Sequence, residues 1–141
     1  MSVQMILLPL FVLVVLTFVV GIVMASRRMR AFKSGTRFED VALRKDAFPA
    51  DAQQANYCFG NLFEMPVLFY VLTILALITK QADLIFVILA WIYVVMRVLQ
   101  ATTHLTTNHL PTRGSFFGVS VLVLAIMWGV YIVRILSLPS V

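Results

Sequence analysis

Glu64 and Arg97 are charged residues that stand inside long apolar segments of this sequence. A charged side chain within a bilayer costs at least about 2.5–3.5 kcal/mol, so such residues face a protein interior or a water-filled cavity and indicate a functional site. Each belongs to a stripe of polar side chains that recurs at helical spacing. The stripes are Gln53, Gln54, Tyr57, Asn61 and Glu64, and Tyr93, Arg97, Gln100, His104 and Asn108.

Two interpretations of these stripes remain open. In the first, Glu64 and Arg97 neutralise each other as a buried ion pair, and Asn61 and Asn108 join helices through hydrogen bonds. In the second, the stripes line a polar pocket, open to the cytoplasm, that binds a polar or anionic ligand. The second is favoured, because two stripes of five polar residues exceed what one ion pair needs.

The remaining chemically active side chains predict neither a metal centre nor a nucleophilic triad. His104 and His109 are five residues apart, which does not place them on one helical face. The single cysteine, Cys58, lies in an apolar stretch and is expected to be a buried packing residue. No metal site, no Ser–His–Asp arrangement and no glycine-rich phosphate loop is predicted.

Four apolar segments must position these residues. The chain has 141 residues, of which 62% are hydrophobic and 12% charged, and each membrane-spanning helix needs about 20 apolar residues. This composition argues against a soluble domain and predicts an all-α integral membrane four-helix bundle as a single domain, residues 1–141. The spans are predicted at about 6–26, 49–79, 84–109 and 115–136. Pro66 predicts a kink in the second span, because its ring clashes with the carbonyl of Leu62.

Seven of the 11 Lys and Arg residues lie in one loop, about residues 27–48, between the first two spans. Loops rich in Lys and Arg remain on the cytoplasmic side, so both termini are predicted to lie outside the cytoplasm. The formal charge of +5 therefore indicates topology and attraction to membrane lipids rather than a nucleic-acid partner. The seven residues are Arg27, Arg28, Arg30, Lys33, Arg37, Arg44 and Lys45.

The motif Asn61-x-x-Glu64 is followed closely by Pro66, and the third span carries the string Arg97 to Asn108, with Arg113 after it. This combination resembles the MAPEG family (membrane-associated proteins in eicosanoid and glutathione metabolism), in particular its bacterial members. The resemblance covers nearly the whole chain. It implies a homotrimer of four-helix subunits, in the bacterial inner membrane for a bacterial member, that binds glutathione between neighbouring subunits near the cytoplasmic face.

The resemblance also implies roles for particular residues. Asn61 and Glu64 match the positions that bind the glutathione peptide. Arg113, with His109 second, is the catalytic candidate for the cation that stabilises the glutathione thiolate. A nearby cation lowers the pKa of a thiol and makes the nucleophile available at neutral pH. Together with the two stripes, the ligand-binding candidates are Asn61, Glu64, Tyr57, Gln53, Tyr93, Arg97, His104 and Asn108.

Some positions depart from the glutathione-using enzymes. Those enzymes carry an arginine where this sequence has Tyr57, and they commonly have a tyrosine where Met65 stands. Two functions are therefore compatible with the sequence. One is a glutathione-dependent transferase or peroxidase that acts on lipophilic electrophiles dissolved in the bilayer. The other is a non-catalytic membrane lipid-binding or scaffold protein of the same fold. A small proton-coupled exporter fits less well. Such exporters usually carry their membrane glutamate in the first span, whereas the first span of this sequence carries no charge.

Overall fold

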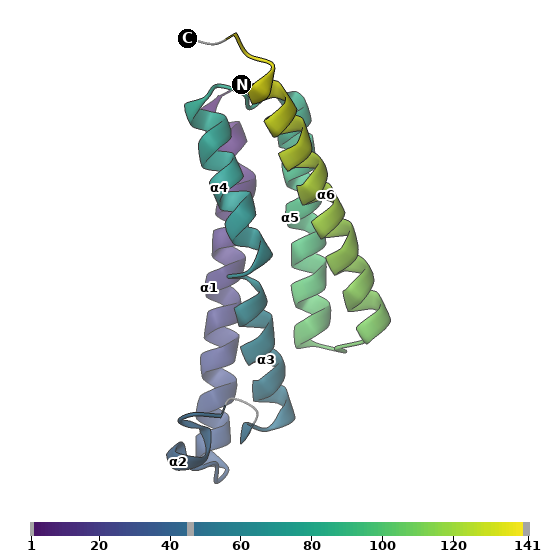
Figure 1. Ribbon diagram of the computed structural model, residues 1–141. Coiled ribbons are helices and arrows are strands. Elements are labelled where there is room, and N and C mark those ends of the chain that lie inside the picture. The colour runs from purple at the N-terminus through teal and green to yellow at the C-terminus, as the bar shows by residue number, and fades with distance from the viewer. Residues whose placement is uncertain (1, 45–46, 140–141) are drawn as a thin grey trace.

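The protein is described here by a computed structural model, which covers residues 2–44 and 47–139; Lys45 of the predicted basic loop lies outside the described residues. Within these ranges every regular element is a helix (Figure 1). Four stretches are long and apolar enough to cross a membrane, which confirms the prediction of an all-α fold with four such segments. They are Val3–Lys33, Ala50–Ile78, Leu84–Leu105 and Leu110–Leu136.

The first helix, α1 (Val3–Lys33), is longer than the predicted span. Ser2 caps its start, where the side-chain hydroxyl accepts a hydrogen bond from the backbone N–H of Met5 at 3.2 Å. Its 31 residues make about 46 Å of helix, whereas the hydrocarbon core is about 30 Å thick. The last turns, residues 27–33, therefore extend beyond the core. The chain turns away at Gly35, whose φ of +115° suits glycine.

The second span consists of two helices rather than one kinked helix. α3 (Ala50–Asn61) ends before Leu62, and α4 (Met65–Ile78) carries Pro66 in its first turn. Proline lacks the backbone N–H and clashes with the carbonyl four residues earlier, but it fits the first turn of a helix. The predicted kink is therefore a complete break, and Glu64 lies at the position that precedes α4.

The last two helices, α5 (Leu84–Leu105) and α6 (Leu110–Leu136), lie side by side, and α3 and α4 follow one another along α1 (Figure 1). Asp83 caps α5 by accepting a hydrogen bond from the backbone N–H of Phe86 at 3.0 Å. α6 begins earlier than residue 115, because Pro111 fits its first turn. Arg113 therefore lies in the first turn of α6 rather than in a loop.

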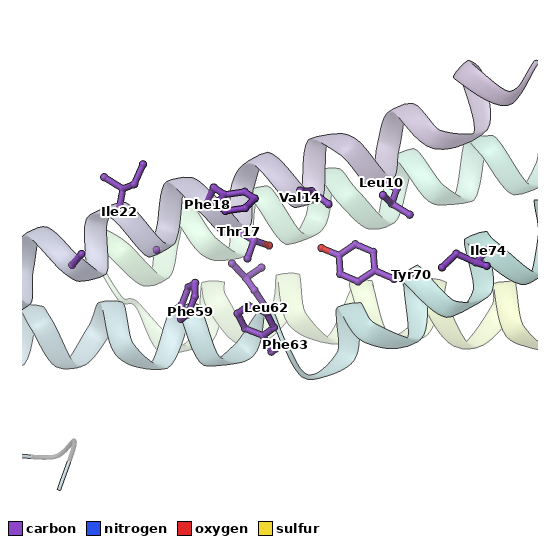
Figure 2. Close-up of a pocket in the computed structure, with 12 residues that line it drawn as sticks. Leu10, Val14, Thr17, Phe18, Ile22, Phe59, Leu62, Phe63, Tyr70 and Ile74 are labelled. Carbon is purple, nitrogen blue, oxygen red and sulfur yellow. The ribbon is translucent and has the colours of Figure 1, made fainter. Parts of the chain in front are cut away.

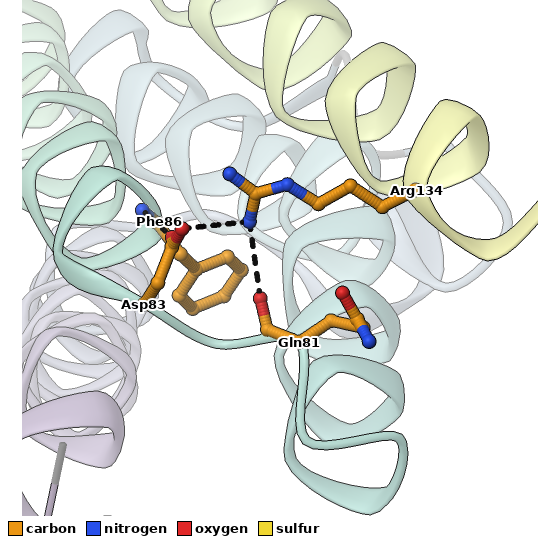
Figure 3. Close-up of polar contacts among 4 residues, drawn as sticks. All are labelled: Gln81, Asp83, Phe86 and Arg134. Carbon is orange, nitrogen blue, oxygen red and sulfur yellow. Dashed lines mark hydrogen bonds and ion pairs between the residues drawn. The ribbon is translucent and has the colours of Figure 1, made fainter. Parts of the chain in front are cut away.

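The two ends of the bundle are held by different arginines. Arg134 on α6 forms an ion pair with Asp83 at 2.8 Å and donates a hydrogen bond to the backbone carbonyl of Gln81 at 3.4 Å (Figure 3). At the opposite end, Arg27 donates to the backbone carbonyls of Asp51 at 3.0 Å and Leu105 at 2.7 Å. Arg27 thus ties α1 to the start of α3 and to the end of α5, where the last carbonyls of a helix lack intrahelical partners.

Two apolar clusters hold the elements together. The main cluster runs along the bundle and contains fully buried residues such as Leu13 of α1, Phe69 of α4 and Leu124 of α6. A smaller cluster of Ala31, Phe48 and Ala52 lies beyond it, at the end that carries the basic loop. The second cluster anchors the segment between α1 and α3, which contains the four-residue helix α2 (Phe38–Val41).

Candidate functional site

A cavity of about 440 Å³ lies between the end of α3, the end of α5 and the start of α6. Residues from both predicted polar stripes line it, together with an arginine from α6. The arrangement therefore combines a carboxylate, two amides, an imidazole, a phenol and a guanidinium around one space. The polar lining residues are Tyr57, Asn61, Glu64, Gln100, His104 and Arg113, and Leu110, Gly114 and Phe117 complete the wall.

The break in the second span brings Asn61 and Glu64 to this cavity. Asn61 is the last residue of α3, and its backbone carbonyl accepts a hydrogen bond from Arg97 Nη2 at 3.1 Å. Glu64 precedes α4 with φ −96° and ψ −98°, and its side chain is exposed. Within residues 2–44 and 47–139 it has no ion-pair partner. The carboxylate is therefore free to bind a cationic group of a ligand.

Arg97 lies behind the cavity wall and does not form the ion pair with Glu64 that the first interpretation requires. It is 1% exposed, and in the described part of the chain it donates to the Asn61 carbonyl instead. Its guanidinium lies 5.9 Å from the centre of the Phe117 ring. Helix α3 ends inside the bundle, where its last carbonyl accepts from the Glu64 backbone N–H at 3.3 Å, and Arg97 supplies a second donor. Arg97 thus acts on the cavity through Asn61 and Phe117.

Arg113 reaches the cavity because Asn108 holds it there. Asn108 adopts a φ of +52°, which asparagine tolerates, and its side-chain carbonyl accepts a hydrogen bond from Arg113 Nη1 at 2.7 Å. The other catalytic candidate, His109, is exposed and does not line the cavity. Its ring Nδ1 lies 2.9 Å from the Thr112 hydroxyl. The geometry therefore favours Arg113 over His109 as the cation of the site.

Besides Arg97 and Asn108, two other predicted ligand-binding residues do not line the cavity. Gln53 does not line it, but its side-chain amide donates to the Tyr57 hydroxyl at 2.9 Å. Tyr93 is buried in the main apolar cluster and stacks on Phe69, with ring centres 4.9 Å apart. Gln53 therefore orients a lining residue, whereas Tyr93 packs in the core.

The prediction of a loop before residue 115 missed the wall that α6 contributes. Leu110, Gly114 and Phe117 belong to that wall, and only Arg113 was among the candidates. The preference of proline for a first helical turn, applied to Pro111, is the sequence signal that could have found them.

Two residues that line the cavity carry buried polar atoms without partners in the described part of the chain. Gln100 and His104 are each 3% exposed. Within the described ranges, Gln100 Oε1 and His104 Nδ1 have no hydrogen-bond partner. An unsatisfied buried polar group costs about 1–3 kcal/mol. A polar ligand that forms hydrogen bonds with these two atoms would recover part of that cost.

A second, apolar groove of about 630 Å³ lies between α1 and the broken second span. Thr17 and Tyr70 supply its only two polar side chains, which point toward each other in Figure 2. Gly21 leaves room for the Phe59 ring, since a Cβ there would lie 3.1 Å from it. The groove therefore suits the aliphatic part of a lipid or of a lipophilic molecule.

Comparisons with known proteins agree with this architecture. A model of the MAPEG family matches residues 6–133, which include every residue that lines the polar cavity. Neither curated proteins nor solved structures give a match. Four segments able to cross a membrane and a family match over nearly the whole length place the chain in a membrane. The chain is therefore an integral membrane protein that belongs to the MAPEG family.

Proposed function

We propose that the protein is a glutathione-dependent transferase or peroxidase that acts on lipophilic electrophiles at the cytoplasmic side of the bilayer. The observation that carries the proposal is the polar cavity, in which Glu64, Asn61 and Arg113 meet. Glutathione offers an ammonium group, two carboxylates, two amides and a thiol. The cavity offers complementary groups, and charge-assisted hydrogen bonds are the strongest available to such a ligand.

In this proposal each side chain has a separate task. Glu64 binds the ammonium group, and the Asn61 and Gln100 amides bind the peptide. Arg113 stabilises the thiolate after the thiol proton has passed to water. The thiolate then attacks the electrophilic carbon, a carbon–sulfur bond forms, and the leaving group departs with its electron pair. The lipophilic substrate reaches the site from the bilayer.

The distribution of charge supports the proposed orientation in the bacterial inner membrane. Residues 27–44, at and after the end of α1, and Arg113, at the start of α6, place seven cations at one end of the bundle. Lys80 follows the end of α4 and Arg134 lies near the end of α6, at the other end. Basic ends remain in the cytoplasm, so glutathione would enter the cavity directly from the cytosol. The start of α1 and the end of α6 would then face the opposite side. We further propose a homotrimer, in which a neighbouring subunit closes the open side of the cavity.

Conjugation of glutathione to a chromogenic aryl halide tests this function with the purified protein in detergent. Wild-type protein is expected to accelerate the reaction. The His109→Ala variant should keep that activity, because His109 lies outside the cavity lining. Tyr57→Phe, which removes only a hydroxyl from the lining, should change KM more than kcat. No acceleration over the uncatalysed rate, together with no glutathione binding, would refute the proposal.

The apolar groove favours one alternative, a non-catalytic lipid-binding or scaffold protein. A groove of about 630 Å³ with two hydroxyls can hold an acyl chain without any thiol chemistry. Under this alternative, native mass spectrometry would show a co-purifying lipid that glutathione does not displace. The same preparation would show no conjugation activity.

A further inference from the structure

The segment between α1 and α3 can be placed in depth relative to the bilayer. α5 has 22 residues and is about 33 Å long, close to the thickness of a hydrocarbon core of about 30 Å. Leu105, its last residue, therefore marks the boundary of the core. Arg27 lies at the same level, because its guanidinium donates to the Leu105 carbonyl at 2.7 Å.

Phe38 of α2 lies at the level of the lipid headgroups. It stacks on Phe32, with ring centres 4.4 Å apart, and Phe32 follows Arg27 by five residues, or about 7.5 Å along the helix. The headgroup layer adds about 5–8 Å to each side of the core. In Figure 1, α2 lies beside the last turns of α1, on the side away from α5 and α6.

The exposed side chains of this segment combine apolar groups with cations. Phe38 is 74% exposed and Leu43 is 98% exposed. Arg30, Lys33 and Arg37 are also exposed, and their side chains form no hydrogen bond or ion pair with a described residue. Apolar side chains flanked by Lys and Arg are typical of segments that lie in the membrane interface.

Another arginine of this end, Arg28, is engaged by α3 and by Phe48. Arg28 Nε donates to the Asn56 side chain at 2.7 Å, and the Arg28 guanidinium lies 5.2 Å from the centre of the Phe48 ring. Phe48 in turn packs in the cluster with Ala31 and Ala52. The segment is therefore anchored to α1 and α3 through Phe48 and Val41, which pack on this cluster.

We propose that Arg30, Lys33, Arg37, Phe38 and Leu43 form a binding surface for anionic lipid headgroups. The three cations contact the phosphates, and the two apolar side chains insert among the headgroups. Two acids, Glu39 and Asp40, stand against six cations between residues 27 and 44, so the local charge is complementary to an anionic lipid surface. This inference is independent of the proposed function.

A lipid titration tests the surface in the full-length protein. Phosphatidylglycerol is added to protein in neutral detergent, and the lipid fraction that gives half of the maximal rise in melting temperature is measured. Each cation near an anionic surface contributes about fivefold, so a triple variant, Arg30→Gln, Lys33→Gln and Arg37→Gln, should lose affinity on the order of 100-fold. The control Lys80→Gln, at the opposite end, should behave as wild type. Equal titrations for the triple variant and wild type would overturn the proposal.

A spin label at position 43 tests the contact itself, and it uses Leu43→Cys because native Cys58 is buried. In nanodiscs with phosphatidylglycerol, the label should be less accessible to a water-soluble relaxant than in phosphatidylcholine alone, and high salt should reverse the protection. Protection that is equal in both lipids would show that another protein copy covers the surface, and that result would also overturn the proposal.

Discussion

Replacement of Arg113 with alanine is expected to lower kcat/KM for glutathione conjugation at pH 7 by about 30-fold, because a thiol with a pKa of about 8.5 is only about 3% ionised at that pH. Arg113 is the only cationic side chain among those that line the described cavity. Its Nη1 donates a hydrogen bond to the Asn108 side-chain oxygen at 2.7 Å, which positions the guanidinium. Without it, the bound thiol should ionise at a pKa close to the free value of about 8.5. Less thiolate would then be present at neutral pH.

The pH profile separates this role from a merely structural one. If Arg113 lowers the pKa of the bound thiol, the Arg113→Ala rate should recover as the pH rises toward the free thiol pKa, whereas the wild-type rate should already be at its plateau. Asn108→Ala keeps Arg113 but removes the side-chain oxygen that accepts its hydrogen bond. We therefore expect a loss of kcat/KM smaller than that of Arg113→Ala. A kcat/KM of Arg113→Ala equal to that of wild type would exclude Arg113 as the activating cation.

Replacement of Arg27 with alanine is expected to produce the largest loss of stability, about 2–4 kcal/mol in the free energy of unfolding. The half-buried guanidinium makes two hydrogen bonds to carbonyls, at 3.0 Å to Asp51 and 2.7 Å to Leu105. Both bonds join helices that are distant in sequence, so their loss uncouples α1 from α3 and α5. Unfolding in neutral detergent, followed by circular dichroism, measures the change.

The chain offers a matched control for this substitution. Arg30 lies on the same helix, is exposed and has no described partner, so Arg30→Ala should alter the free energy of unfolding by no more than about 0.5 kcal/mol. Neutral detergent removes any contribution from anionic lipid. Equal effects of the two substitutions would mean that the Arg27 contacts contribute nothing beyond charge.

The sequence predicts the helices well because length and apolarity decide them. Runs of about 20 apolar residues need no tertiary information to be recognised as membrane-spanning. The break before Glu64 was not predicted, because the apolar pattern continues through it and Pro66 is compatible with either a kink or a new helix. The choice depends on a tertiary contact: where α3 ends, the Asn61 carbonyl accepts a hydrogen bond from the Glu64 backbone N–H at 3.3 Å and a second one from Arg97, which lies on another helix.

The candidate site was also predicted only in part from the sequence. Helical spacing correctly groups Tyr57 and Asn61 on α3 and places His104 on α5, and these residues line one cavity. Glu64 lines the same cavity although it follows the end of α3, so helical spacing does not explain its position. The ion pair between Glu64 and Arg97, which was the less favoured interpretation, does not form in the described part of the chain, because the Asn61 backbone carbonyl binds the guanidinium instead. No sequence pattern predicts the apolar groove, because the groove arises from the spacing between α1 and the second span, which is broken into α3 and α4.

Glutathione titration by calorimetry, with wild-type protein and the Glu64→Gln variant, tests the central claim most directly. Wild-type protein should bind glutathione saturably. Glu64→Gln should weaken binding by about 10- to 100-fold, the value of one charge-assisted hydrogen bond. Its melting temperature should stay unchanged, because Glu64 has no ion-pair partner in the described structure. Equal affinity in the two proteins, or a variant that loses stability in parallel with binding, would contradict the assignment of this cavity as the glutathione site.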